Sequence, residues 1–245
     1  TPSRSSAASD VYKRQPSLRV LIIEKEFCGY GASGRNGGWC EGALAGGTEK
    51  YAKRSTMGEA LRLERTMFET VDEIQRVLDS EDINCDFHKG GFVSVARNLP
   101  QALRQRSAVE LARERGTAEE IIRILDADEA RAHVNATNVH SGIFFAPSAV
   151  VDPGKMVRGL AKAVERKGGT IVEGTTALSI STGKVECAEG VVSADVIVQA
   201  TEGYTRDIKG KKLDLLPVYS RMIATEPLTD SQISEIGLAD RPTFN

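Results

Sequence analysis

The stretch LRVLIIEKEFCGYGASGRNGG, residues 18–38, decides the fold prediction. Its first six residues, LRVLII (18–23), are almost all aliphatic, which is typical of a parallel strand buried on both faces. Glu24 closes this strand at its carboxyl end. In doubly wound α/β folds ligands bind outside the carboxyl ends of the strands, and an acidic residue there bonds the ribose hydroxyls of an adenine dinucleotide. The alternative for Glu24 is a solvated glutamate that only ends the strand.

The glycine-rich stretch GASGRNGG, residues 31–38, follows this strand. Glycines at this density let a backbone approach a planar or phosphorylated ligand, with its N–H groups facing that ligand and no Cβ in the way. Arg35 adds a forked cation suited to phosphate, and Asn36 adds an amide that both donates and accepts. Because Trp39 follows at once, we favour a ligand-binding loop over a flexible surface loop.

The glycine turn that normally precedes such a loop is missing. In dinucleotide folds the acidic residue lies about 20 residues after a GxGxxG turn, whereas no glycine precedes Gly29. Residues 1–15, TPSRSSAASDVYKRQ, are polar, serine-rich and aperiodic, and stand where the first crossover helix is expected. We interpret them as a non-native tail, similar to translated adapter sequence, or as a disordered native tail. A dinucleotide fold without its first glycine turn is either a wrong interpretation or a truncated protein, and the adapter-like tail makes us favour a truncated piece of a longer protein.

Composition excludes several classes of protein. The chain has 245 residues, 40% of them hydrophobic, enough for one large domain or two small ones. Its 32 Lys and Arg against 34 Asp and Glu give a net charge of -2, without a basic cluster interleaved with aromatics, which argues against a nucleic-acid partner. No run approaches the roughly 20 apolar residues of a membrane span, and no apolar signal core opens the chain. We therefore predict a cytoplasmic protein.

The cysteines and histidines do not have the spacing of a disulfide framework or a metal site. No CxxC pair occurs, and no histidine stands at helical ligand spacing from another histidine or a cysteine. We predict reduced thiols and no metal. The residues concerned are Cys28, Cys40, Cys85, Cys187, His88, His133 and His140.

Hydrophobic periodicity and capping signals predict the remaining elements. We expect strands 18–23, 170–172 and 194–198 to lie in one sheet, because parallel neighbours are joined by right-handed crossovers. In chain order, the other predicted elements are an amphipathic helix over 57–83, a hairpin within 85–97, a helix over 100–115, a short helix capped by Asp126, a helix from Pro153 to Gly168 and Gly169, and a strand over 194–201.

The segment EKEFCGYGASGRNGGWCEG, residues 24–42, resembles the signature of the FAD-dependent amine and amino-acid oxidases of the D-amino-acid oxidase and glycine oxidase superfamily. Within it the segment is similar to bacterial proteins of the gamma-glutamylputrescine oxidoreductase type. The resemblance extends from Leu18 to Asn245 and implies an α/β fold, α+β overall. It implies a partial Rossmann-like FAD-binding domain, 16–84 with 141–212, interleaved with a partial antiparallel-sheet substrate domain, 85–140 with 213–245.

The resemblance also implies which residues contact FAD. Glu24 would hold the adenosine ribose, and its neighbour Lys25 would belong to the cofactor-binding residues. A later E-x-T-x-V pattern appears as Glu173, Thr175 and Ala177, with alanine in place of valine, and the segment LLPVYSRMIATEPL (215–228) resembles a strand that re-enters the substrate domain. The loop residues Ser33, Gly34, Arg35, Asn36, Gly37 and Gly38 would cover the pyrophosphate and the flavin edge, and Ala177, Ala200 and Thr201 would lie along the adenylate.

The function that the resemblance implies is oxidation of a primary or secondary amine or an amino acid, with hydride transfer to flavin. The partner would be that small-molecule substrate; catalytic residues and oligomeric state stay unassigned. Two alternatives remain: a non-catalytic fragment of such an enzyme, and an NAD(P)-dependent dehydrogenase. Because the first glycine turn is absent, we expect the 245-residue chain alone to hold FAD weakly and to be inactive.

Overall fold

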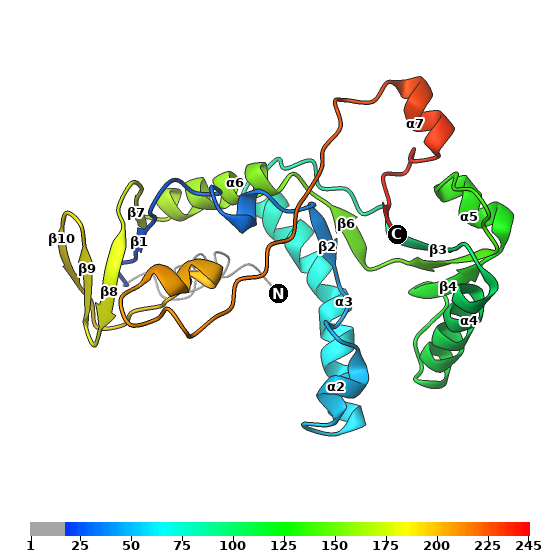
Figure 1. Ribbon diagram of the computed structural model, residues 1–245, viewed down its shortest axis with the longest axis horizontal. Coiled ribbons are helices and arrows are strands. Elements are labelled where there is room, and N and C mark those ends of the chain that lie inside the picture. The colour runs from blue at the N-terminus through cyan, green and yellow to red at the C-terminus, as the bar shows by residue number, and fades with distance from the viewer. Residues whose placement is uncertain (1–17) are drawn as a thin grey trace. The chain divides into compact units, whose positions relative to one another are not determined.

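The computed structural model describes residues 18–245, so the predicted tail 1–15 lies outside the described residues. The chain folds into two compact units that alternate along the sequence (Figure 1), as expected for interleaved domains. Among the described residues, unit 1 comprises 18–37, Glu81–Cys85 and Pro153–Ile223. Unit 2 comprises Gly38–Ser80, Asp86–Asp152 and Ala224–Asn245. The proposed domain limits differ from these units, chiefly at 38–80, and stay a prediction.

Unit 1 contains the predicted parallel strand pair. Strand β1 (Leu21–Ile23) pairs in parallel with β7 (Thr170–Val172), and Leu21 lies opposite Thr170. The expectation that this strand is buried on both faces is wrong, because Leu21 is 44% exposed. A two-stranded sheet has no inner strand, so neither of its members is enclosed by neighbours along the sheet.

The third predicted strand of this sheet does not form. Residues 194–201 have no strand structure, although their β-branched composition favours it. Val196 and Val198 are each 78% exposed. A strand needs a neighbouring backbone as hydrogen-bond partner, and none of the strands within residues 18–245 pairs with this segment. The strand expected over 215–228 is likewise absent; that segment is extended and largely exposed.

Helix α6 (Pro153–Arg166) supports the β1–β7 pair. It begins at Pro153, as predicted. The N–H group at the first helical position has no acceptor within the helix, so proline, which lacks this group, is tolerated there. Val157, Leu160 and Val164 form its buried face. Gly168, with φ +89°, ends the helical region just before β7. The predictions of where this helix begins and ends are therefore confirmed.

The rest of unit 1 is a small antiparallel sheet and two short 3-10 helices. Strand β9 (Lys184–Cys187) lies between β8 (Ala177–Ser181) and β10 (Gly190–Ser193). Helix η1 (Ala32–Gly34) lies in the glycine-rich loop and contacts α6, while η2 (Glu202–Asp207) follows the predicted strand segment that did not form.

Unit 2 is built on a four-stranded sheet of order β11-β3-β5-β4. Strand β3 pairs with β5 and β11, so the predicted hairpin within 85–97 is wrong, although its strand exists. A buried cluster of Val93, Leu125, Ala130, Val134 and Val139 forms its core. The bounds are β3 Phe92–Ala96, β4 Ile122–Leu125, β5 Ser141–Phe145 and β11 Thr243–Phe244, with a separate pair β2 Trp39–Glu41 and β6 Ser148–Val150.

The helices of unit 2 confirm the amphipathic and capping signals. Asp126 accepts hydrogen bonds from the N–H groups of Asp128 (2.9 Å) and Glu129 (2.8 Å), which is the predicted cap.

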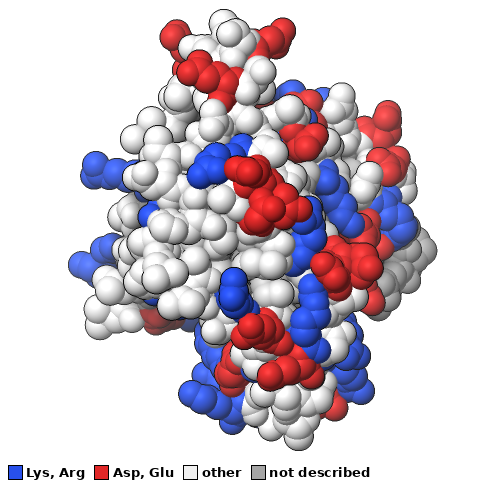
Figure 2. All heavy atoms as spheres, turned by 90° about the vertical axis from the view of Figure 1, so that its right-hand side faces the viewer, with Lys and Arg blue, Asp and Glu red and all other residues white. Residues whose placement is uncertain are grey.

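The charged side chains of the surface are mixed in sign. On the face shown in Figure 2, acidic and basic side chains are interspersed. No helix within residues 18–245 is long and apolar enough to cross a membrane. The helices are α2 Thr48–Ala52, α3 Met57–Ser80, α4 Leu99–Glu114, α5 Ala127–His133 and α7 Asp230–Ile236.

Candidate functional site

Glu24 stands at the carboxyl end of β1, where the sequence places it. Its backbone N–H donates to Val172 (2.9 Å), and its carbonyl accepts from the N–H of Thr175 (2.9 Å), so the ladder with β7 continues past the strand. Its partly buried carboxylate accepts from the N–H of Glu26 (2.9 Å). The backbone and this local bond therefore orient the carboxylate without another side chain.

The turn after β7 lies against the segment after β1. Gly174 N–H donates to the carbonyl of Glu26 (3.0 Å), and Cys28 N–H donates to a carboxylate oxygen of Glu173 (2.7 Å). Glu173 and Thr175, the first two members of the E-x-T-x-V pattern, thus lie beside Glu24. Burial, followed by the nearby carboxylate of Glu173, raises the pKa of the Cys28 thiol to about 11. Cys28 is therefore a protonated thiol at neutral pH.

The glycine-rich loop is closed on itself. A Cβ on Gly34 would lie 2.7 Å from the Cα and carbonyl carbon of Gly29, and nearer still to its oxygen. The N–H groups of Gly34 and Arg35 donate to the carbonyls of Gly31 (3.2 Å) and Ala32 (3.3 Å). The expectation that backbone N–H groups of this loop face a ligand is therefore wrong for these two, because η1 uses them.

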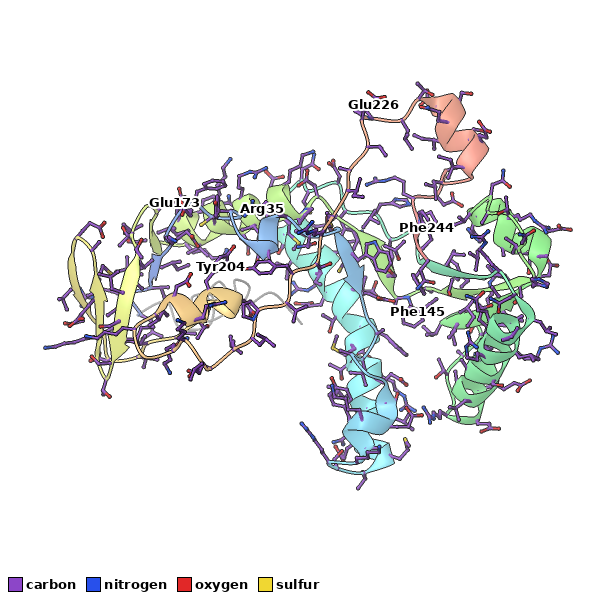
Figure 3. The ribbon with its side chains drawn as sticks, viewed as in Figure 1. Arg35, Phe145, Glu173, Tyr204, Glu226 and Phe244 are labelled. Atoms are coloured by element: carbon purple, nitrogen blue, oxygen red, sulfur yellow. The ribbon has the colours of Figure 1, made fainter. Side chains whose placement is uncertain are left out.

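Two polar side chains of the loop have different environments. Asn36 bonds to the loop backbone, whereas Arg35 is exposed. The Asn36 amide donates to the carbonyls of Ala32 and Ser33, both at 3.1 Å, and so stabilises η1. The exposed Arg35 guanidinium lies over the Tyr30 ring, 4.6 Å from its centroid. Tyr204 packs against Gly31, 3.2 Å from where a Cβ would be. The side chains of Tyr204 and Arg35 are labelled in Figure 3.

Tyr30, Tyr204 and Cys28 were not among the predicted site residues. The available signals were one aromatic residue directly before the GASG run and another directly after the ATEG run. Neither spacing shows that Tyr204 would reach a loop more than 150 residues earlier in the chain, because only the packing of η2 brings it there.

The remaining predicted residues lie in several places. Lys25 is exposed, with its ammonium 4.0 Å from Glu26. Ala177 begins β8, and Thr201, next to Ala200, bonds Thr205 through its hydroxyl (2.8 Å). Gly37 ends the first segment of unit 1 and Gly38 begins unit 2 with φ +71°, a conformation suited to glycine.

A cavity of about 300 Å³ opens beside Glu173 in unit 1. Three charged residues of α6 line it: Arg158, Lys162 and Glu165. Cys28 and Ile171 line it as well. Within residues 18–245, no group of three or more His, Cys, Asp and Glu side chains is arranged to hold a metal ion. The cavity lining is Cys28, Arg158, Ala161, Lys162, Glu165, Ile171 and Glu173.

Comparison with known families decides the identity of the fold. Residues 5–244 match the family described as FAD dependent oxidoreductase, DAO. The chain belongs to this family. The resemblance read from residues 24–42 is thereby confirmed, as are the α/β fold class and the FAD cofactor of the family.

Individual relatives agree with this assignment. The Haemophilus influenzae protein described as "Probable oxidoreductase OrdL" is 29% identical over 226 residues, 87% of this chain and 51% of that protein. Gamma-glutamylputrescine oxidoreductase of Escherichia coli is 25% identical over 228 residues, 91% of this chain and 53% of that protein. The chain spans about half the length of these curated relatives. The crystal structure of glycine oxidase from Geobacillus kaustophilus shares the fold, with a TM-score of 0.62 at 19% identity over 78% of this chain and 50% of that one.

Proposed function

We propose that the protein containing this chain oxidises a primary or secondary amine or an amino acid with FAD. Its family is FAD-dependent, and two of its relatives are named for gamma-glutamylputrescine and glycine. The observation that carries the proposal is the partly buried carboxylate of Glu24, oriented at the carboxyl end of a parallel strand. In this chemistry FAD accepts a hydride, while the protein supplies binding and orientation.

Glu24 and Lys25 are assigned to the adenosine ribose. A carboxylate accepts hydrogen bonds from both hydroxyls of a ribose, and the bond from Glu26 N–H supports Glu24 in that role without neutralising its charge. The donor chemistry at this strand end therefore fits the adenosine half of FAD.

Residues 33–38 are assigned to the pyrophosphate and the flavin edge. Arg35 is the charged member of this loop, and its guanidinium suits phosphate oxygens. Asn36 acts through the loop, because its amide holds η1. The small side chains of Ala177 and Ala200 leave room for the adenylate, and the Thr201 hydroxyl is held by Thr205.

The role of Glu24 is tested by Glu24→Gln in the whole protein that contains this chain. Removing the charge while keeping the size weakens a charge-assisted hydrogen bond, and we expect FAD affinity to fall roughly tenfold. Glu189→Gln is the matched control, since Glu189 is an exposed carboxylate of the same unit outside the assigned residues. Equal FAD affinity for wild type and Glu24→Gln, measured by flavin fluorescence titration, contradicts the assignment.

The substrate class is tested by anaerobic mixing of the FAD-loaded whole protein with primary amines, secondary amines and amino acids. We expect bleaching of the flavin absorbance with at least one of these classes. Bleaching by none of them, together with reduction by a substrate that has no nitrogen, overturns the proposed substrate class but leaves FAD binding in place.

A further inference from the structure

Helix α6 carries a row of four basic side chains on one face. Lys155, Arg158, Lys162 and Arg166 follow each other at intervals of three or four residues, which places them on one side of a helix. All four are exposed, and they stand away from the buried face described above. This row was not recognised from the sequence, because the four residues are separated by mostly apolar residues and by Glu165, and form no continuous basic run.

The row lines a second cavity of unit 1, of about 230 Å³, which we call the basic pocket. Four cations face one carboxylate there, that of Asp82. A volume of this size accommodates a small ligand. The lining of the basic pocket is Asp82, Ile83, Asn84, Lys155, Arg158, Gly159, Lys162 and Arg166.

The wall opposite α6 is held by a close approach of the 81–85 segment to the helix. A Cβ on Gly159 would lie 3.2 Å from Cβ and Cγ1 of buried Ile83, and nearer to its Cγ2, so glycine lets this segment reach the helix. Asp82 has φ +53°, a left-handed conformation that few residues other than glycine adopt. The close approach at Gly159 and the left-handed backbone of Asp82 therefore help to form the basic pocket, in addition to the basic side chains of α6.

The charges near the basic pocket are unevenly paired. Glu81, beside the pocket, is 11% exposed and forms an ion pair with Lys167 (2.6 Å), and Arg166 donates to the Glu81 carbonyl (2.6 Å). Arg158 and Lys162, by contrast, have no ion-pair partner within 4.0 Å in the part of the chain that the structure describes.

Two other carboxylates come near these cations from the adjoining cavity. Glu165 and Glu173 line that cavity together with Arg158 and Lys162. Within residues 18–245, neither carboxylate forms an ion pair with either cation. Cations at this spacing repel one another, and a bound anion would offset the repulsion.

We propose that the basic pocket binds a small multivalent anion of the phosphate class. A guanidinium binds two phosphate oxygens through its fork, and a lysine ammonium adds a point charge, so a doubly charged tetrahedral anion suits this combination better than a monocarboxylate. The lining of the basic pocket includes neither Glu24 nor any residue of the loop 33–38, and the proposal does not rest on the proposed FAD chemistry.

Isothermal titration of the 245-residue chain with pyrophosphate tests the proposal. We expect one binding site, about a fivefold or greater loss of affinity in Arg158→Gln and in Lys162→Gln, and loss of measurable binding in the double variant. Lys212→Gln is the matched control, since Lys212 is an exposed cation of the same unit outside the pocket. Far-UV circular dichroism checks that each variant keeps its secondary structure.

Raising the ionic strength from about 0.05 M to about 0.5 M shortens the screening length several-fold, and we expect wild-type affinity to fall about tenfold or more. This measurement needs no variant, so it retains its meaning if a substitution disturbs folding. Arg35→Gln separates this site from the FAD site, because Arg35 is the charged residue assigned to the FAD pyrophosphate. Pyrophosphate affinity stays unchanged in this variant if the two sites are distinct.

Several results overturn the proposal. Absence of pyrophosphate binding, or an equal loss in Lys212→Gln, shows that the pocket has no specific anion site. Equal affinity for citrate shows that it does not select phosphate. Binding to phosphatidylserine vesicles without binding to pyrophosphate assigns the row to a lipid surface. Loss of pyrophosphate binding in Arg35→Gln places the probe at the dinucleotide site.

Discussion

Replacing Gly34 by alanine tests whether the glycine-rich loop needs glycine for its own closure. The added Cβ would lie 2.7 Å from two backbone atoms of Gly29, well inside the usual contact distance, and nearer to the Gly29 oxygen. Backbone atoms on both sides cannot rotate away as a flexible side chain does. The loop therefore has to open, which breaks the bonds of η1 or moves Gly29 off its φ of +95°.

Overpacking substitutions cost about 1–3 kcal/mol, and because both clashing partners are backbone we expect Gly34→Ala to cost about 3 kcal/mol. Local opening of residues 29–36 would then be favoured on the order of 100-fold, which hydrogen exchange of the peptide covering this loop measures directly. Gly203→Ala is the matched control in the same unit, because its Cβ meets nothing nearer than Pro217 at 3.9 Å. Equal exchange rates for Gly34→Ala and Gly203→Ala would refute this reasoning.

Two further predictions concern single side chains. With its pKa raised to about 11, chiefly by burial, Cys28 should react with iodoacetamide at pH 8 about 100-fold more slowly than an ordinary thiol, and faster as the pH rises toward 11. Glu173→Gln should speed this reaction, and peptide mass spectrometry follows both; labelling as fast in the folded as in the urea-unfolded chain contradicts the prediction. Asp126→Ala removes the cap of α5 and should lower the free energy of unfolding by about 1 kcal/mol in urea denaturation, whereas Glu119→Ala, in an exposed turn, should not.

Local signals predicted those elements that local chemistry controls. Helix α6 begins at Pro153 and ends before Gly168 because a missing N–H and a left-handed φ act within one turn. The cap at Asp126 likewise needs only the next three residues. The parallel pairing of β1 with β7 was also predicted, from the apolar composition of these strands and from the rule that parallel neighbours are joined by right-handed crossovers.

The errors concern partners that lie far away in the chain. Residues 194–201 have strand composition but no strand beside them, and β3 pairs with β5 and β11 where a local hairpin was expected. Composition indicates that a segment favours strand structure. It does not indicate which other backbone segment lies close enough to accept or donate its hydrogen bonds.

The sequence by itself determined the family, through the glutamate and the GASGRNGG loop, because those residues are contiguous. Only the tertiary structure showed that Gly34 and Asn36 serve the closure of the loop itself, that Tyr204 packs on Gly31, and that the four cations of α6 meet the 81–85 segment at one cavity. The physical reason is that close packing depends on distances between segments distant in the chain, and no local periodicity encodes those distances.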